Sequence, residues 1–414
     1  MMEQIRRGLS WLRDNFMSGV LILMGLASHL STAMMSVLIG IGILFFLIDL
    51  WQKRIGHPFR SIDRAAGGVF CVFSASILLE ALLSLEPGRS LSEAASTIFH
   101  MVPFFLALFY VRSWRVAGFI LTAFAVSALL NDVWAYLQVK WKIESGWGPG
   151  RPVGFSKSPT FLGSFMLLTI PLLLLVPHAL PGWIRRIFLW GCGIFSMYIL
   201  VLSQTRGAWL AFGGVLLLFV LLNRRHRAIC LSGLVILVLS GVMLYHTSPV
   251  IQDRWETMSN EKFQSNTERV LMWKGAAQIF ADHPVFGVGQ GEFGLVYNRD
   301  YLAPEAKERP RDPNNPRSGH GHPHNNLLKV LSERGLVGIA FFLLLHGFIL
   351  WELLRALRRG EGKKAYAFAL AGILTFAGVQ FEGMTDTNLQ LAHIVRTYWF
   401  LMGLCLATGQ IREG

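Results

Sequence analysis

The chain has 414 residues, of which 53% are hydrophobic and only 15% are charged. Length alone would suggest two or three soluble domains, but this balance predicts a polytopic helical membrane protein instead. The net charge of +13 does not indicate nucleic-acid binding, because the basic residues stand in short loops between apolar runs. The four cysteines all fall inside apolar runs, at spacings that fit neither a disulfide framework nor a cysteine metal site.

Twelve apolar runs approach the length of about 20 residues that a membrane-spanning helix needs. The predicted fold class is therefore an all-α integral membrane protein. The first two runs are separated only by the polar residues 28–32, and the first run is expected to act as an uncleaved insertion signal. The predicted spans lie near 16–31, 33–51, 67–85, 92–111, 115–137, 160–177, 187–204, 206–223, 227–246, 327–351, 365–385 and 390–410.

Lysine and arginine accumulate in every second connection between these runs, starting with the N-terminal segment. Cytoplasmic loops carry that excess, so both termini are predicted to be cytoplasmic. The segments 138–159 and 247–326 are then extracytoplasmic, which in a bacterium with two membranes means periplasmic. We accordingly divide the chain into spans one to nine (1–246), a periplasmic cap loop (247–326) and spans ten to twelve (327–414).

The 247–326 segment carries nine Lys or Arg and ten Asp or Glu, with many aromatic residues. This aromatic content is too high for disorder, so we expect a folded, partly helical cap. The loop 145–159 lies on the same side of the membrane. It is rich in glycine and proline and carries Arg151 and Lys157.

Arg206 lies where the seventh span closes and the eighth opens. Ser203 or Thr205 is a natural N-cap, so the Arg206 side chain falls in the first turn of the eighth span, where the helix dipole adds positive potential. Together they form a candidate anion site at the membrane edge. The alternative is an arginine that snorkels and anchors the helix end.

Arg269 falls in the first turn of a second predicted helix, an amphipathic helix that lies on the bundle. Asn266 or Thr267 is the expected cap, and His283-Pro284 ends the helix. Its expected apolar positions are Val270, Trp273, Ala277 and Phe280. The alternative for Arg269 is a surface ion pair with Glu268 or another neighbour.

A histidine run, His320, His322 and His324, leads into the tenth span, with Asn325 or Asn326 as the cap. A positive helix end disfavours the imidazolium, so His324 is a candidate general base. The alternating histidines could instead bind a metal, but no carboxylate or cysteine accompanies them at fitting spacing, so we predict no metal site. A purely structural histidine is the other alternative.

Two further features stand near the predicted cap. The glycine-rich segment 287–294 follows no predicted strand, so a tight turn beneath the cap explains it better than a dinucleotide loop. Asp386 lies at the periplasmic end of the eleventh span, one turn after Glu382. Acidic residues in such places are functional candidates. A helix-end carboxylate paired to an arginine is the structural alternative.

Several of these motifs together resemble the bacterial O-antigen ligase and polymerase superfamily. The motifs are His324-Asn325 followed by Gly335 and Gly338, the SQTRG sequence at 203–207, and the Arg269 helix followed by HPVFGVG at 283–289. One large periplasmic loop between spans nine and ten is also similar to that family. The resemblance is specific in residues 203–338 and architectural elsewhere.

The resemblance implies an inverting, metal-independent glycosyltransferase that needs no cofactor. Its donor is an O-antigen glycan carried on undecaprenyl pyrophosphate, and membrane lipids surround it in the bacterial inner membrane. By position, Arg206 and Arg269 would hold the donor pyrophosphate and His324 would deprotonate the acceptor hydroxyl. His322, Asn325, Asp386, Arg151 and Lys157 are candidate supporting residues.

The acceptor separates the members of this superfamily. We expect an O-antigen ligase, which transfers the glycan to the lipid A–core oligosaccharide in lipopolysaccharide biosynthesis. The enzyme alternatives are an O-antigen polymerase and a protein O-oligosaccharyltransferase with the same donor. Outside enzymes, a transporter of lipid-linked oligosaccharides is the alternative, although the cations gather at one face and no repeated halves are visible.

Overall fold

The computed structural model describes residues 2–52, 60–147, 150–223, 264–312, 314–360 and 364–411, with a few isolated positions between 242 and 256. These residues form thirteen α-helices, joined by loops and short 3₁₀ and π turns. The helices are α1 (Met2–Leu30), α2 (Thr32–Trp51), α3 (Ser61–Leu82), α4 (Pro87–Tyr110), α5 (Trp114–Lys140), α6 (Pro159–Leu175), α7 (Trp183–Leu202), α8 (Arg206–Leu222), α11 (Gln264–Asp282), α12 (Phe293–Val296), α13 (Asn326–Arg359), α14 (Lys364–Glu382) and α15 (Ala392–Thr408).

Among the described residues, eight helical segments are long and apolar enough to cross a membrane, namely α2 to α5, α6 with its following 3₁₀ turn, α7, α13 and α14. They indicate a multi-pass membrane protein, as the sequence predicts, but twelve spans are not found. The apolar parts of α1 and α8 are shorter. The twelfth predicted span begins only at Ala392, because residues 388–390 form a 3₁₀ turn. The ninth, 227–246, lies outside the described residues.

The separation of the first two spans is confirmed, and a serine cap explains it. Ser31 has extended backbone angles, and its hydroxyl accepts a hydrogen bond from the Met34 N–H at 3.2 Å. Such a cap satisfies one of the free N–H groups at a helix start. The apolar stretch is therefore divided at the polar residues that the sequence indicates.

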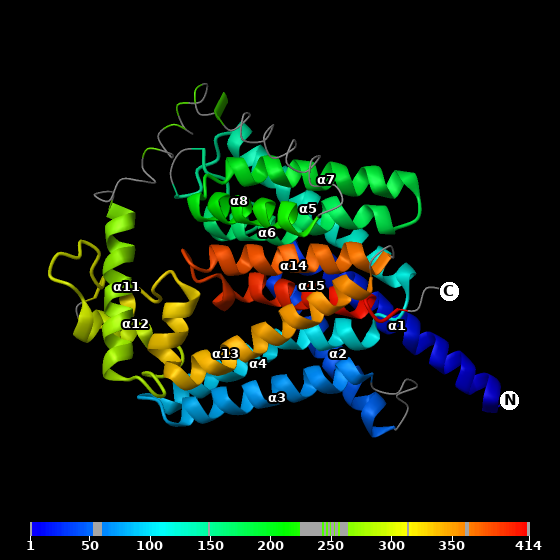
Figure 1. The fold of residues 1–414 in the computed structure, drawn as a ribbon, viewed down its shortest axis with the longest axis horizontal. Helices are drawn as coiled ribbons and strands as arrows, with labels where there is room; N and C mark the ends of the chain where they lie inside the picture. The colour runs from blue at the N-terminus through cyan, green and yellow to red at the C-terminus, as the bar shows by residue number, and fades with distance from the viewer. Residues whose placement is uncertain are drawn as a thin grey trace.

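The membrane helices lie side by side in a bundle, and α11 and α12 cover one end of it (Figure 1). Helix α1 begins and α15 ends at the opposite end of the bundle. Large apolar side chains such as Leu44, Ile194 and Leu343 are more than half exposed on its outside. Exposed apolar side chains on spanning helices suit a lipid environment.

The residues beyond the bundle form a folded unit, which we call the cap: α11, α12 and the chain from 283 to 325. The cap has its own apolar core, which includes Met272, Ile279, Phe293 and Tyr297. The predicted apolar stripe of α11 was misplaced, because Val270 is 44% exposed while Met272, Ala276 and Ile279 are buried. The helix turns this second face toward Tyr297, whose ring packs on Gly275.

The cap is joined to α13 by backbone pairing at a break in that helix. Gly335 has φ 62° and ψ −157°, so α13 is not one straight span. Around it, Leu336 N–H donates to Pro284 at 2.8 Å, and Val288 N–H donates to Ser332 at 3.1 Å. A Cβ on Gly335 would collide with the Val285 carbonyl. The glycine-rich segment 287–294 contains the predicted turn, since the Glu292 N–H donates to the Gly289 carbonyl at 3.1 Å, but it belongs to the cap and runs into α12.

Candidate functional site

The histidine run is held against the segment that follows α14. Asn325 caps α13, since its side chain accepts a hydrogen bond from the Leu328 N–H at 3.0 Å, as the sequence predicts. The Asn325 amide donates to the Met384 carbonyl at 2.9 Å, and the Asn326 N–H donates to the Gly383 carbonyl at 2.7 Å. These bonds fix the start of α13 on residues 383–384.

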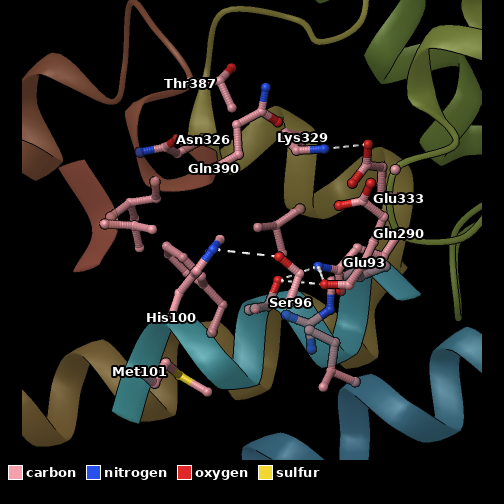
Figure 2. A pocket seen from close by; sticks show the side chains of 18 of the residues that line it. Glu93, Ser96, His100, Met101, Gln290, Asn326, Lys329, Glu333, Thr387 and Gln390 are labelled. Atoms are coloured by element: carbon pink, nitrogen blue, oxygen red, sulfur yellow. Dashed lines mark hydrogen bonds and ion pairs between the residues drawn. The ribbon is translucent and has the colours of Figure 1, made fainter. Parts of the chain in front are cut away.

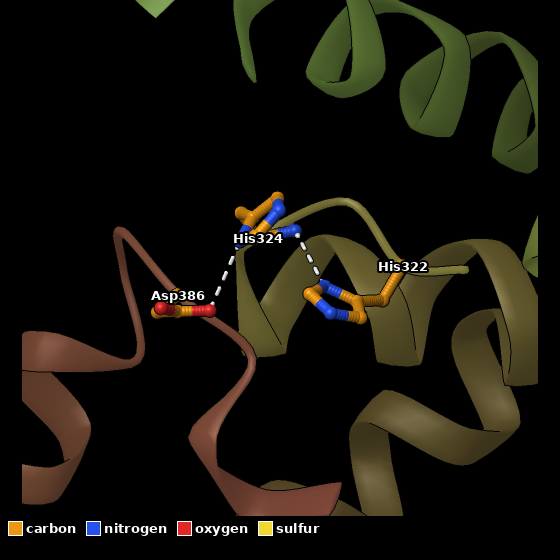
Figure 3. Close-up of side chains that lie close together, drawn as sticks. All are labelled: His322, His324 and Asp386. Atoms are coloured by element: carbon orange, nitrogen blue, oxygen red, sulfur yellow. Dashed lines mark hydrogen bonds and ion pairs between the residues drawn. The ribbon is translucent and has the colours of Figure 1, made fainter. Parts of the chain in front are cut away.

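This attachment brings His324 to Asp386, as Figure 3 shows. The Nδ1 atom of His324 lies 3.0 Å from a carboxylate oxygen of Asp386. Because an ionised carboxylate can only accept, Nδ1 carries the proton, and the neutral ring then offers the lone pair of Nε2. His324 also has a φ of 50°, an uncommon left-handed conformation that strained functional residues often adopt.

Asp386 is 6% exposed, and the oxygen that faces His324 also accepts the Thr387 N–H at 2.7 Å. Burial by itself raises the pKa of this carboxyl. The hydrogen bond from His324 and the nearby positive charges, Arg269 included, outweigh burial and hold the pKa below its usual value. The predicted alternative was a helix-end carboxylate paired to an arginine. Its partner is wrong, because the side chain that hydrogen-bonds to Asp386 among the described residues is His324.

His322 supports the backbone of His324. Its Nδ1 accepts the His324 N–H at 3.4 Å, and the two rings meet edge to face with centroids 4.3 Å apart. Burial lowers the pKa of the His322 ring, and the neighbouring His324 adds to the effect. A neutral His322 ring is consistent with an Nδ1 atom that accepts a hydrogen bond.

One sequence argument against a metal fails. No carboxylate stands near the histidines in sequence, yet the structure places Asp386 with His322 and His324, and their ligand atoms lie within 4.8 Å of one another. The Nδ1 atom of each histidine already has a partner, since His324 Nδ1 is bonded to Asp386 and His322 Nδ1 to the His324 N–H. A metal bound through these Nδ1 atoms would have to displace both bonds.

His320 does not join this group. Its Nε2 lies 3.4 Å from Glu308 and 3.8 Å from Glu268, within the cap. Burial lowers the pKa of the His320 ring and exceeds the opposite effect of the two carboxylates. Of the three alternating histidines, His320 therefore has a structural position in the cap, whereas His322 and His324 belong to the candidate site.

Arg206 is the first residue of α8, as predicted, and Thr205 is the N-cap residue. The Thr205 hydroxyl does not cap the helix but donates to the Pro159 carbonyl at 2.9 Å. The preceding Gln204 has a φ of 52°, a second left-handed residue beside the site. An Arg206 guanidinium nitrogen donates to the Asn266 side chain of α11 at 3.1 Å, which links the two predicted arginine helices.

Arg269 does not lie in the first turn of its helix, because α11 begins at Gln264 instead of at the predicted cap. The helix-dipole argument therefore does not apply to it. Arg206 and Arg269 nevertheless line the same cavity of 660 Å³, which we call the cationic cavity. Lys274 is a third cation on its wall, one that sequence reasoning missed, and the exposed Glu305 also contributes.

The cationic cavity lies close to the histidine site. Thr385, the neighbour of Asp386, belongs to its lining, and Thr385 packs so closely on Gly207 that a Cβ there would collide. Arg151 and Lys157 are not part of the lining that the described residues form. Their loop instead supports the start of α8, since the Gln204 amide donates to Gly150 at 3.3 Å.

Known proteins share this part of the chain. Residues 191–343 match the family model described as O-antigen ligase, and the match includes Arg206, Arg269 and His324. A Rickettsia prowazekii protein named "Putative polysaccharide ligase RP358" is 24% identical over 250 residues, covering 55% of this chain and 54% of that protein. An O-antigen ligase of Salmonella typhimurium is 25% identical over 251 residues, covering 58% of each protein.

The chain spans about half the length of the curated relatives that it matches. Asp386 and the helices α3 and α4 lie outside the family match, so only the structure connects them to the site. The matched residues hold both arginines and the histidine at one end of the bundle. Residues 191–343 of the chain match the O-antigen ligase family model, and the chain is distantly homologous to O-antigen ligase and to polysaccharide ligases.

Proposed function

We propose that this protein is an O-antigen ligase, an inverting glycosyltransferase of the bacterial inner membrane. It moves O-antigen polysaccharide from undecaprenyl pyrophosphate to the lipid A–core oligosaccharide at the periplasmic face. One observation carries the proposal: the His324–Asp386 pair lies beside a cavity lined by Arg206, Arg269 and Lys274.

The cationic cavity suits the leaving group of this reaction. When the bond between the sugar and the pyrophosphate breaks, negative charge grows on the phosphate oxygen. Guanidinium groups fixed in a site stabilise that charge through short, charge-assisted hydrogen bonds. The bond from Arg206 to Asn266 and the helical setting of Arg269 hold both groups before the donor arrives.

In this proposal His324 acts as the base. Its Nε2 removes the proton of the acceptor hydroxyl while that oxygen attacks the anomeric carbon of the donor sugar. The carbon–oxygen bond to the pyrophosphate breaks, both electrons leave with undecaprenyl pyrophosphate, and the proton stays on the imidazole. Asp386 stabilises the resulting imidazolium and keeps the ring oriented. Attack from the face opposite the leaving group inverts the anomeric configuration.

The proposed reaction uses no metal, because three cations of the chain line the wall at the expected position of the pyrophosphate. Activity should therefore persist in EDTA. A loss of activity in EDTA that a divalent ion restores would refute this part and favour metal binding by His322, His324 and Asp386. Isothermal titration with the same ion would check the site directly.

The decisive experiment uses purified protein and undecaprenyl-pyrophosphate glycan, with and without lipid A–core, and His324→Ala as the control. Glycan on lipid A–core with the wild type alone supports the ligase. Longer lipid-linked chains without a core acceptor would indicate a polymerase, and glycan on a protein acceptor would indicate an oligosaccharyltransferase. Donor that is bound without any new glycosidic bond would favour a transporter.

A further inference from the structure

A second cavity of 370 Å³ lies between α3, α4, α13 and α15, as Figure 2 shows in part. Its volume falls within the range of about 300–1,000 Å³ that small-ligand sites occupy. The lining combines apolar side chains, Phe73, Phe342 and Trp399 among them, with polar ones. None of these wall residues has a part in the donor chemistry described above.

Three polar atoms on the lining are buried and lack a hydrogen-bond partner among the described residues: Thr387 Oγ1, Gln290 Oε1 and His346 Nε2. The Thr387 and His346 side chains are only 2% and 6% exposed. Buried polar groups are almost always satisfied, so atoms of this kind indicate a ligand or ordered water that belongs there.

These three atoms have a common chemistry. The amide nitrogen of Gln290 already donates to Thr97 at 2.6 Å, so its oxygen remains as an acceptor. His346 Nδ1 is bonded to the Phe342 carbonyl at 2.9 Å, so Nδ1 carries the proton and Nε2 accepts. With the Thr387 hydroxyl, the cavity offers two acceptors and one group that both accepts and donates. That set matches the hydroxyl groups of a sugar.

The charges on the same walls are already paired. Lys329 pairs with Glu333, Arg334 with Glu80, and the Arg89 guanidinium lies 3.6 Å from Glu292. Glu93 adds a carboxylate to the lining. A pyrophosphate would have to displace these partners and approach carboxylates, whereas a neutral sugar would not. In this respect the second cavity differs from the cationic cavity.

The segment that carries Asp386 contributes to the lining of both cavities. Thr385, on one side of Asp386, lines the cationic cavity, while Thr387, on the other side, lines the second. Gly321 and Asn326, which stand before and after His324 in sequence, both line the second cavity. A base located between two substrate sites is what single displacement requires, since the nucleophile and the leaving group lie on opposite sides of the anomeric carbon.

We infer that the second cavity is the acceptor subsite and that it takes an uncharged, hydroxylated sugar ring instead of a sugar linked to a second pyrophosphate. This inference rests on the proposed function, because it assigns the acceptor side of that reaction.

The kinetic test uses Thr387→Val, which removes one hydroxyl, keeps the shape of the side chain, and leaves the Thr387 N–H on Asp386. The KM for lipid A–core should rise about 3- to 10-fold, as expected for one lost hydrogen bond, with the KM for the donor unchanged. Thr387→Ser keeps the hydroxyl and is the matched comparison. A rise in the donor KM, or equal losses in both variants, would overturn the assignment.

A binding test separates this inference from the catalytic proposal. Gly321 lines the cavity, and a Cβ at this position meets no atom within 4 Å, so Gly321→Trp should obstruct the cavity without disturbing the backbone. In a His324→Ala background, lipid A–core binding should weaken strongly while binding of the undecaprenyl-pyrophosphate donor remains. Unchanged acceptor binding would overturn the inference even if the wild type proves to be a ligase.

Discussion

Replacement of Asp386 by asparagine removes a charge from the site while leaving its shape intact. The same carboxylate oxygen accepts both the His324 Nδ1–H at 3.0 Å and the Thr387 N–H at 2.7 Å. An amide oxygen can occupy that position and accept both bonds. Asp386→Asn therefore tests whether the negative charge of Asp386 matters, separately from its contacts.

The expected loss follows from the charge that forms during the reaction. His324 becomes an imidazolium as it takes the acceptor proton, and a hydrogen bond between charged groups contributes about 1.5–3 kcal/mol. At about 1.4 kcal/mol for each factor of ten, kcat should fall about 10- to 150-fold. His324→Ala removes the base itself and should cost about 10²- to 10⁴-fold.

The assay measures the initial rate of glycan transfer to lipid A–core, with donor and acceptor varied independently. The loss should appear in kcat, with the donor KM nearly unchanged. Lys157→Gln is the matched control, since that exposed side chain lies outside the lining of the cationic cavity that the described residues form. It should retain the wild-type rate.

Two results would refute this reasoning. A full rate for Asp386→Asn would mean that the carboxylate only holds the ring in place. A loss confined to the donor KM would mean that Asp386 acts through the electrostatics of the cationic cavity, where Arg269 influences its pKa. In that case His324 would need another group to stabilise its charge.

Three further predictions concern the donor site, the break in α13 and the effect of pH. Arg206→Gln and Arg269→Gln should each raise the donor KM about 10-fold or more, as expected for a lost charge-assisted bond. If neither arginine holds the pyrophosphate, the affinity for undecaprenyl pyrophosphate measured by titration would not change. Gly335→Ala forces a side chain into a conformation open mainly to glycine and against the Val285 carbonyl, so the free energy of unfolding should fall by about 1–3 kcal/mol; an unchanged melting temperature would contradict this. Because the folded-state pKa of Asp386 lies below its ordinary value of about 3.9, its ionised form stabilises the fold above that pH, and the stabilisation is lost as pH falls through the folded pKa. The stability difference between wild type and Asp386→Asn should thus be constant at neutral pH and shrink below about pH 4. Calorimetry in detergent measures this difference, and one that does not shrink at low pH would contradict the prediction.

The sequence determined the features of this protein that depend on local patterns. Apolar runs of helical length predict the membrane helices. Residues with strong local preferences mark several helix ends, including Ser31 before α2, Asn325 before α13 and Pro284 after α11. Arg206 and His324 stand out because each lies at such an end, and the SQTRG and HPVFGVG motifs resemble a known family.

Only the tertiary structure decided which residues meet. Asp386 lies 62 positions from His324, and their contact depends on the backbone bond from Asn326 to Gly383, which no local pattern reveals. The buried face of α11 was also decided by packing, since the helix contacts Tyr297 at Gly275.

The two cavities depend on tertiary structure even more strongly. The cationic cavity needs α8 and α11 to meet, and the second cavity needs α4, α13 and α15 around one space. Hydrophobic periodicity indicates which side of a helix is buried but not which helix covers it, because burial is non-directional. The sequence therefore identifies single functional candidates, while the pairing of base with carboxylate and the separation of donor from acceptor come from the packing of distant helices.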